Sequence, residues 1–108
     1  VKRNLLSPYG PLLLSPAYTI PDPTIGYVTR YSPGSRENGG VYMHAATWAL
    51  AAACKQRDAE SVSRIWKSIS PPTRGQDAQS YFAEPYVTPG NVDGPLSDKP
   101  GRAGWTWY

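Results

Sequence analysis

The stretch VYMHAATWALAAACKQRDAESVSRIWKSI, residues 41–69, decides the fold. From Val41 to about Lys55 every residue is a tolerable or strong helix former, with alanine at positions 45, 46, 49, 51, 52 and 53. Because this segment is apolar nearly all round, it predicts a helix that is buried on most sides. The only cysteine, Cys54, is then expected to pack as a small hydrophobic side chain.

A second helix is predicted directly after a short polar link. Asp58 is well placed as its N-cap, and Pro71-Pro72 ends it near Ile69. The apolar residues between follow the helical spacing i, i+3, i+4 and i+7: Val62, Ile65, Trp66 and Ile69. Two helices joined by so short a link predict an antiparallel αα-hairpin.

The flanks of this hairpin are rich in residues that favour turns, since the 108 residues include 12 Pro and 10 Gly. Proline removes a backbone donor and disfavours helix at the residue before it. Residues 1–39 therefore predict loops, with short extended pieces at Leu12–Leu14 and Gly26–Tyr31. Residues 71–108 also predict loops, with one extended piece over Tyr81–Val87. The two loop regions thus flank a helical hairpin at residues 40–70.

Composition excludes several classes of protein. The length allows one small domain, and no apolar run approaches the roughly 18 residues of a membrane span. A single cysteine excludes an internal disulfide framework and a zinc site built on several cysteines. The net charge of +3 is too weak to predict nucleic-acid binding. We therefore expect no membrane, metal or nucleic-acid partner.

We expect residues 1–108 to fold stably only inside a larger protein. Two helices can bury one face against each other, but the rest of a nearly all-apolar first helix stays uncovered, and the loops must still be ordered. The chain also ends on Trp105-Thr106-Trp107-Tyr108, a run of aromatic residues typical of an interior stretch. The sequence therefore predicts a partial segment that continues beyond Tyr108.

The densest polar cluster is the turn YSPGSRENGG, residues 31–40, which leads into the first helix. The free N–H groups and the dipole of a helix N-terminus favour an anion. Arg36 offers a planar fork for an oxyanion, and His44 is expected about one turn inside the helix. A phosphate site is one interpretation. The alternative is a capped helix with Arg36 and Glu37 in solvent and His44 satisfied within the core.

Glu84-Pro85-Tyr86 is a second candidate. The carboxylate of Glu84 could bind a sugar hydroxyl or act as an acid or base, but the spacing alone favours a simple turn. The many aromatic residues, 8 Tyr and 4 Trp, suit stacking against sugar rings and would equally fill a core. P-loop, dinucleotide-binding, nucleophile-elbow and zinc-protease motifs are not found.

Three strings in this order resemble glycoside hydrolase family 94: YSPGSRENGGVYMHAATWAL (31–50), EPYV (84–87) and GRAGWTWY (101–108). The likeness extends to PDPTIGYVTRY (21–31). This family comprises inverting β-glucoside phosphorylases, among them cellobiose, cellobionic acid and chitobiose phosphorylases, and the phosphorylase-like domain of cyclic β-1,2-glucan synthases. The resemblance implies a mainly α fold. The chain would be a late segment of an (α/α)6 barrel, with the αα-hairpin as one inner–outer helix pair and residues 71–108 lining the active site.

The resemblance also implies an activity and a set of site residues. The reaction is cleavage of a β-linked glucosyl disaccharide or oligosaccharide by inorganic phosphate to give α-glucose 1-phosphate. His44 matches the phosphate-binding histidine, while Tyr31, Arg36 and Glu37 match residues that line the acceptor-sugar subsite. Glu84 and Tyr86 are further candidate sugar contacts.

Several parts of that site are expected outside this chain. The general-acid Asp of the family has no match here, and a phosphate-binding Thr/Ser-Gly pair would follow the last aromatic residues. The resemblance implies a hexosyl phosphorylase that uses phosphate as co-substrate and no other cofactor, with the remainder of the barrel as partner. It also implies a cytoplasmic homodimer in which this segment alone is inactive. The alternative is a non-catalytic carbohydrate-binding or scaffold fragment.

Overall fold

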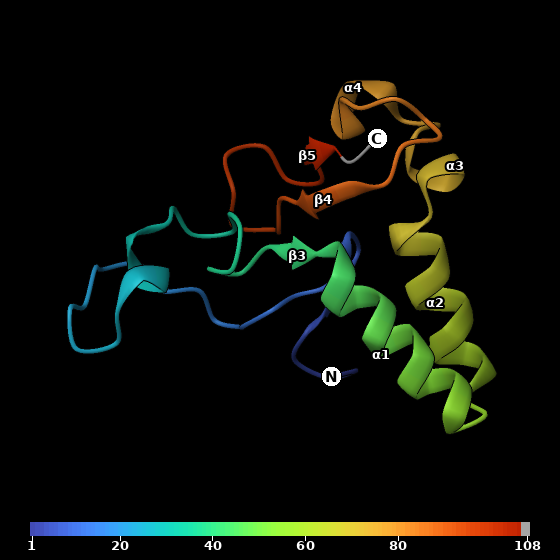
Figure 1. Cartoon of the computed structure of the whole chain (residues 1–108), viewed down its shortest axis with the longest axis horizontal. Helices are drawn as coiled ribbons and strands as arrows, with labels where there is room; N and C mark the ends of the chain where they lie inside the picture. The colour runs from blue at the N-terminus through green and yellow to red at the C-terminus, as the bar shows by residue number, and fades with distance from the viewer. Residues whose placement is uncertain (107–108) are drawn as a thin grey trace.

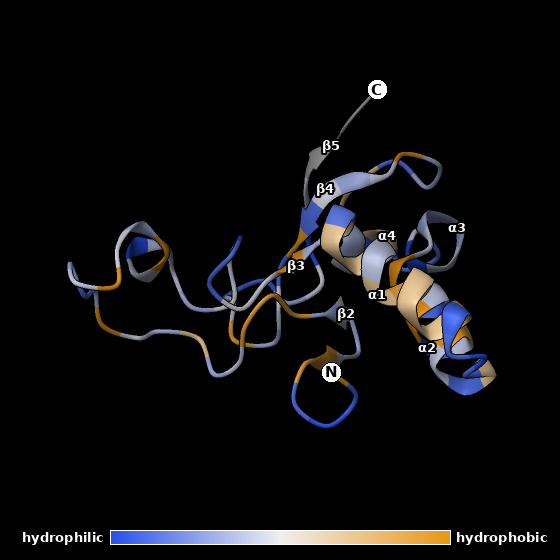
Figure 2. Cartoon of the chain, turned by 60° about the horizontal axis from the view of Figure 1, so that its bottom comes forward, coloured by the Kyte–Doolittle hydropathy of each residue, from blue (hydrophilic) through white to orange (hydrophobic). Residues whose placement is uncertain are grey.

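A computed structural model describes residues 1–106 of the chain. Its largest feature is a pair of antiparallel helices, α1 (Met43–Lys55) and α2 (Ala59–Ile69), which pack side by side (Figures 1 and 2). The predicted αα-hairpin is therefore confirmed. The loop that carries residues 17–35 extends away from this pair as an arm (Figure 1). Within residues 1–106, no helix is long and apolar enough to cross a bilayer.

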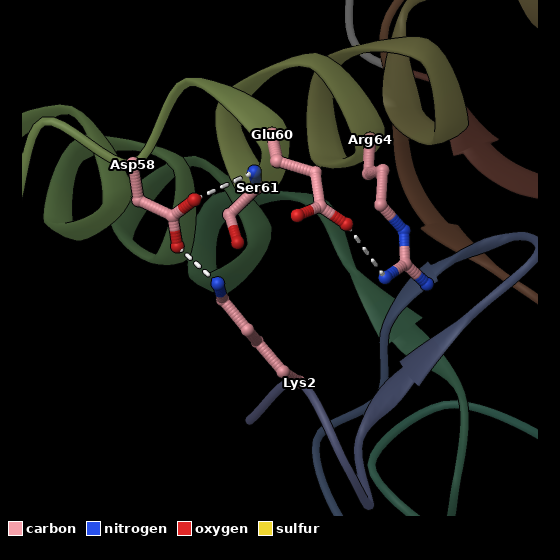
Figure 3. A network of polar contacts seen from close by, with 5 residues as sticks. All are labelled: Lys2, Asp58, Glu60, Ser61 and Arg64. Carbon is pink, nitrogen blue, oxygen red and sulfur yellow. Dashed lines mark hydrogen bonds and ion pairs between the residues drawn. The ribbon is translucent and has the colours of Figure 1, made fainter.

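Asp58 caps α2 as the sequence predicts. Its carboxylate accepts a hydrogen bond from the backbone N–H of Ser61 at 3.1 Å and forms an ion pair with Lys2 (Figure 3). The hydrogen bond from Lys2, followed by those from Ser61, lowers the pKa of Asp58 from 3.8 to about 2. Glu60 and Arg64 form a longer ion pair of 3.9 Å on the same helix. The Lys2 contact ties the start of the chain to the hairpin.

The apolar surface of α1 is only partly covered by the described chain. Met43, Ala46 and Ala53 are buried, whereas Trp48 is 71% exposed and Cys54 is also exposed. The predictions of a helix buried on most sides, and of Cys54 as a packed hydrophobic side chain, are therefore wrong within this chain. The physical reason is that α1 packs mainly against α2 and the short strands at Val41–Tyr42, Pro89–Val92 and Gly10–Pro11, and these elements of the described chain leave Trp48 exposed.

The apolar stripe of α2 is narrower than the spacing predicts. Ile65 and Ile69 are buried and Val62 is half-buried, but Trp66 is 55% exposed. Trp66 follows Ile65 directly, and successive residues of an α-helix lie about 100° apart around its axis. Its ring therefore lies at the edge of the contact with α1, beyond the reach of the core.

A three-stranded antiparallel sheet covers the N-terminal end of α1. It consists of β3 (Val41–Tyr42), β4 (Pro89–Val92) and β5 (Ala103–Thr106), in the order β3-β4-β5. The partners in register are Val41 with Val92, Tyr42 with Asn91, and Asn91 with Gly104. The first two residues of the predicted helix are thus a strand, because their backbone groups pair with β4.

Smaller elements fill the remaining segments. A two-stranded hairpin joins β1 (Leu6–Ser7) and β2 (Gly10–Pro11), and a 3-10 helix, η1, spans Tyr27–Arg30. Two single-turn helices, α3 (Pro71–Arg74) and α4 (Ala78–Tyr81), follow α2. Like Asp58 in α2, Asp77 caps α4 by accepting from the N–H of Ser80 at 3.1 Å.

The fold class is therefore mixed, and the expectation of one helical hairpin between loops is too narrow. The predicted extended pieces Leu12–Leu14, Gly26–Tyr31 and Tyr81–Val87 form no strands, and residues 71–108 contain helices and strands instead of loops alone. Pro71-Pro72 ends α2 as predicted, but it also starts α3. Proline fits the first turn of a helix, where its missing N–H has no partner in any case.

The core lies where α1, α2 and the sheet meet, and Tyr81 of α4 closes one end of it. Its buried members are Val41, Met43, Ala46, Ala53, Ile65, Ile69, Tyr81 and Val92. The ring of Tyr81 is fully buried, and its hydroxyl has no hydrogen-bond partner among the described residues. Burial raises the pKa of Tyr81 above its usual value of 10.0, while the positive charge of Arg74 opposes that rise.

Glycines join the turn before β3 to the loop after β4. The N–H of Gly94 donates to the carbonyl oxygen of Gly34 at 2.7 Å. A Cβ on Gly94 would overlap the carbonyl oxygen of Gly39, and one on Gly34 would overlap the backbone of Ser97. Gly34 also has a φ of 84°, which disfavours any larger residue. The turn at residues 31–40 is thus held against a distant loop by backbone contacts.

Candidate functional site

His44 lies in the first turn of α1, as its second residue, and its side chain is exposed. It is closer to the helix start than the predicted full turn. The alternative in which His44 is satisfied within the core is wrong for the described chain. Tyr42, which precedes α1, has an extended backbone and provides no side-chain cap, in contrast to Asp58 before α2. Within the described part of the chain, the first amides of α1 thus have no side-chain cap at its N-terminus.

Two aromatic rings flank the imidazole of His44. The ring of Tyr42 lies nearly parallel to it, with centroids 6.2 Å apart and planes 5° apart. The indole of Trp48, one helical turn further on, lies 5.6 Å away and is tilted by 46°. These contacts restrict the orientation of the imidazole while its edge stays accessible. Thr47 donates its hydroxyl to the carbonyl oxygen of His44 at 2.7 Å.

A hollow of about 430 Å³ opens beside this histidine. Its polar side chains are those of Tyr42, His44, Thr47 and Thr88, and its floor includes the backbone of Pro89-Gly90 in β4. The imidazole of His44 and the hydroxyl groups of Tyr42 and Thr88 are groups that can donate hydrogen bonds, whereas the Thr47 hydroxyl is already used by the His44 carbonyl oxygen. The hollow therefore places several possible donors beside the start of α1.

The turn that precedes β3 carries a second group of side chains. Arg36 has a φ of 50°, and its guanidinium lies over the ring of Tyr31, 4.9 Å from the centroid. The ring of Tyr27 meets Tyr31 edge to face at 5.4 Å, and the guanidinium of Arg30 lies 5.5 Å from the Tyr27 centroid. Tyr31 and Arg36 are thus brought together, as a planar ring and a planar cation.

The two groups occupy different parts of the described structure. The residues that line the hollow beside His44, among residues 1–106, do not include Tyr31, Arg36 or Glu37. Glu37 is exposed in the turn. Tyr31 and Arg36 thus lie close together in the turn, and neither is among the described residues that line the hollow beside His44.

Glu84 and Tyr86 lie in an exposed turn between α4 and β4. The N–H of Val87 donates to the carbonyl oxygen of Glu84 at 3.2 Å, so the turn favoured by the spacing is present. Tyr86 is 84% exposed, and neither residue lines the hollow beside His44. Within residues 1–106, no three His, Cys, Asp or Glu residues are grouped so that they could hold a metal ion.

Sequence reasoning missed several residues around His44. Thr47 and Trp48 follow it by three and four positions, so helical spacing alone could have found them. Thr88 and Pro89-Gly90 reach the hollow through the pairing of β3 with β4, for which the sequence gives no local signal. In the final aromatic motif, β5 carries the backbone up to Thr106, and Trp107 and Tyr108 lie outside the described residues.

The chain is similar in sequence to one known family and to several known proteins. Residues 1–108 match the catalytic domain of the glycosyl hydrolase 94 superfamily. The chain is 43% identical over 88 residues, 77% of its length, to the cyclic beta-(1,2)-glucan synthase NdvB of Rhizobium meliloti. It is 33% identical to solabiose phosphorylase of Paenibacillus borealis and 31% identical to N,N'-diacetylchitobiose phosphorylase of Vibrio proteolyticus, each over 107 residues and 99% of its length.

The chain spans only a small part of these relatives: 3% of the synthase, 14% of solabiose phosphorylase and 13% of the chitobiose phosphorylase. The match to the family nevertheless covers every residue of the chain. The matched span includes the turn at residues 31–40 and the start of α1, where the candidate site lies. The chain belongs to the glycosyl hydrolase 94 superfamily and is a segment of its catalytic domain.

Proposed function

We propose that this chain is part of an inverting glycoside phosphorylase. The enzyme cleaves a β-linked glucosyl disaccharide or oligosaccharide with inorganic phosphate and releases α-glucose 1-phosphate. Family membership and the two phosphorylases named above support this reaction class. Residues 1–108 would form a late segment of an (α/α)6 barrel, with α1 and α2 as one of its helix pairs. The remainder of the barrel would cover the exposed face of α1.

The observation that carries the proposal is the exposed imidazole of His44 beside the hollow at the uncapped start of α1. An N–H group of the imidazole and the first amides of α1 would donate to phosphate oxygens, and the helix dipole adds a favourable field. Trp48 and Tyr42 would keep the ring in place. His44 thus holds the attacking phosphate.

The chemistry needs one carboxylic acid where an inverting hydrolase needs two. A hydrolase requires a second carboxylate to activate water. Phosphate is already an anionic nucleophile, so the protein has only to hold it below the anomeric carbon and reduce the repulsion during attack. A general acid protonates the leaving glycosidic oxygen on the opposite face. We place that acid outside residues 1–108.

Tyr31, Arg36 and Glu37 would hold the acceptor sugar, which is the leaving group of the cleavage. The ring of Tyr31 provides a face for stacking and the exposed carboxylate of Glu37 can accept hydrogen bonds from hydroxyl groups. Glu84 and Tyr86 are accessible enough to add a further sugar contact. Barrel segments outside this chain would complete a substrate site that includes both the turn at residues 31–40 and the hollow beside His44. A cytoplasmic homodimer stays a prediction from the family resemblance.

A second candidate function is that of a segment in a cyclic β-(1,2)-glucan synthase. The 43% identity to NdvB, above the 33% and 31% to the two phosphorylases, favours it. The same phosphate site would then act on β-1,2-linked glucose chains. A non-catalytic carbohydrate-binding or scaffold role is the remaining alternative, and it predicts sugar binding without any phosphate-dependent product.

One experiment separates these functions. The full-length protein is incubated with cellobiose, sophorose, laminaribiose or chitobiose, each with and without inorganic phosphate, and the products are followed by ¹H and ³¹P NMR. The proposal predicts an α-sugar 1-phosphate from at least one disaccharide, only when phosphate is present. Reaction of sophorose alone favours the glucan synthase. Release of free sugar without phosphate, or no product from any disaccharide, contradicts the phosphorylase function.

A further inference from the structure

Asn38 is fully buried although its side chain is polar, and it lies between Glu37 and the two glycines of the turn. Its Oδ1 accepts a hydrogen bond from the N–H of Tyr18 at 2.8 Å. Its Nδ2 donates to the carbonyl oxygens of Tyr18 at 2.9 Å and Tyr31 at 2.7 Å. Both N–H groups of the amide and its oxygen are therefore used, and each partner is a backbone group.

These bonds fix the backbone from which the ring of Tyr31 projects. Tyr31 contacts Arg36 on one side and Tyr27 on the other. The backbone of Asn38 also closes the turn, because its carbonyl oxygen accepts from Gly34 at 2.8 Å and its N–H donates to Ser35 at 3.0 Å. The relative position of the Tyr31 ring and the Arg36 guanidinium thus depends on one buried amide.

His44 is held by different contacts. The strand before it pairs with β4, with Val41 opposite Val92, and the carbonyl oxygen of Gly40 accepts from the N–H of Leu13 at 3.0 Å. His44 itself lies in α1, which packs on α2. A change in the Asn38 side chain therefore acts first on the 31–36 segment, and the phosphate hollow keeps its own supports.

We infer that Asn38 is a positioning residue for the acceptor-sugar subsite. This inference rests on the proposed function, because it needs Tyr31 and Arg36 to contact the acceptor. Asn38 does not touch the sugar. It sets where the ring and the guanidinium stand, and so it controls the affinity for the acceptor while the affinity for the phosphate-bearing substrate stays the same.

The test uses Asn38→Asp in the full-length protein. Asp has the same shape, but one carboxylate oxygen then faces the carbonyl oxygens of Tyr18 and Tyr31, so two hydrogen bonds become repulsive contacts. Asn38→Ser, which is shorter and removes the bonds without that repulsion, serves if the first variant does not fold. Ile65→Ala is the matched control, since it removes core packing in α2, which is not part of the turn.

Kinetics are measured in the synthetic direction, with α-glucose 1-phosphate as donor and D-glucose, N-acetyl-D-glucosamine and D-gluconate as acceptor probes. We expect Asn38→Asp to raise the KM for the best acceptor by about tenfold, on the scale of one lost buried hydrogen bond, while the KM for α-glucose 1-phosphate stays within about twofold. The smaller Asn38→Ser change is expected to give the same split between the two KM values. Ile65→Ala is expected to lower the thermal midpoint without that split.

Two results overturn the inference. The first is an acceptor KM in Asn38→Asp and Asn38→Ser within about twofold of the unchanged protein, which would leave the bonds to Tyr31 without a role in binding. The second is an equal rise of both KM values, which would mean a general loss of structure. If the unchanged protein uses none of the acceptors, the proposed function itself fails, and this outcome is visible before any variant is made.

Discussion

At the scale of single residues, burial of the Tyr81 hydroxyl lowers the stability of the folded state. Its ring is fully buried at one end of the core, but its hydroxyl has no partner among the described residues. A buried polar group without a hydrogen bond destabilises the folded state. The ring therefore stabilises the fold, and the hydroxyl weakens it.

We predict that Tyr81→Phe in the full-length protein raises the free energy of unfolding by about 1 kcal/mol, because the unpaired hydroxyl is removed. Burial raises the pKa of Tyr81, so the unfolded chain ionises first and the unchanged protein loses stability above about pH 10. The advantage of the variant should grow there. Urea unfolding at neutral and alkaline pH measures both effects. Tyr86→Phe, at a largely exposed position, is the control, and an equal gain there would refute the reasoning.

At the scale of secondary-structure elements, the two long helices α1 and α2 could be predicted, whereas the short helices α3 and α4 and the sheet could not. The cap at Asp58 and the spacing of Ile65 and Ile69 gave the bounds of α2, because these signals are local. In β4 and β5 the sequences PGNV and AGWT contain proline and glycine and show no apolar alternation. Their pairing with β3 arises from contacts far apart in sequence, which no local pattern encodes.

The residues of the candidate site also divide into those to which the sequence points and those that only the structure brings in. The sequence motifs single out Arg36, Tyr31 and His44 as candidates, whereas the contact between the Arg36 guanidinium and the Tyr31 ring is seen only in the structure. The hollow beside His44 needs Thr88, which directly precedes β4, and the backbone contacts that hold the turn need Gly94 from a distant loop. Exposure of Cys54 could not be predicted either, since it depends on which segments cover α1.

The Asp58 cap of α2 predicts how the stability of the protein changes at acidic pH. The ion pair with Lys2 and the bonds from Ser61 lower the pKa of Asp58 to about 2. Because the pKa of Asp58 is lower in the folded protein than in the unfolded chain, its carboxylate stabilises the fold at pH values above about 4. This stabilisation is lost as the pH falls from about 4 to about 2. Asp58→Asn keeps a capping side chain but should lack this pH-dependent part. Chemical unfolding at several acidic pH values tests it, with Lys2→Gln expected to remove only part of the dependence.

The backbone contacts of Gly94 with Gly34 and Gly39 join the turn at residues 31–40 to the loop at residues 93–102, and they predict the effect of a substitution at Gly94. Gly94→Ala places a methyl group against the carbonyl oxygen of Gly39, so it should destabilise the protein by about 1–3 kcal/mol and weaken acceptor binding. Gly104→Ala is the matched control, because its added carbon meets only the movable side chain of Asn91 at 3.3 Å. Thermal unfolding of both variants gives the comparison. Equal thermal unfolding midpoints for the two variants would mean that the backbone around Gly94 adjusts at little cost in stability, which would contradict this prediction.

At the scale of the whole molecule, the exposed outer face of α1 indicates a larger body around this segment. Trp48 is 71% exposed and Trp66 is 55% exposed, although both belong to the helical pair that forms the core. We predict that a polypeptide of residues 1–108 shows no cooperative thermal transition by circular dichroism. The same residues within the full-length protein should unfold cooperatively. A sharp transition in the isolated segment would show that it is an independent domain.

Phosphate binding at His44 can be tested through the dependence of the phosphorolysis rate on phosphate concentration. In the full-length protein, His44→Ala should raise the KM for phosphate by about tenfold or more and leave the KM for the disaccharide within about twofold. Cys54→Ala, at the other end of α1, should change neither value. Unchanged phosphate saturation in His44→Ala would contradict the central claim.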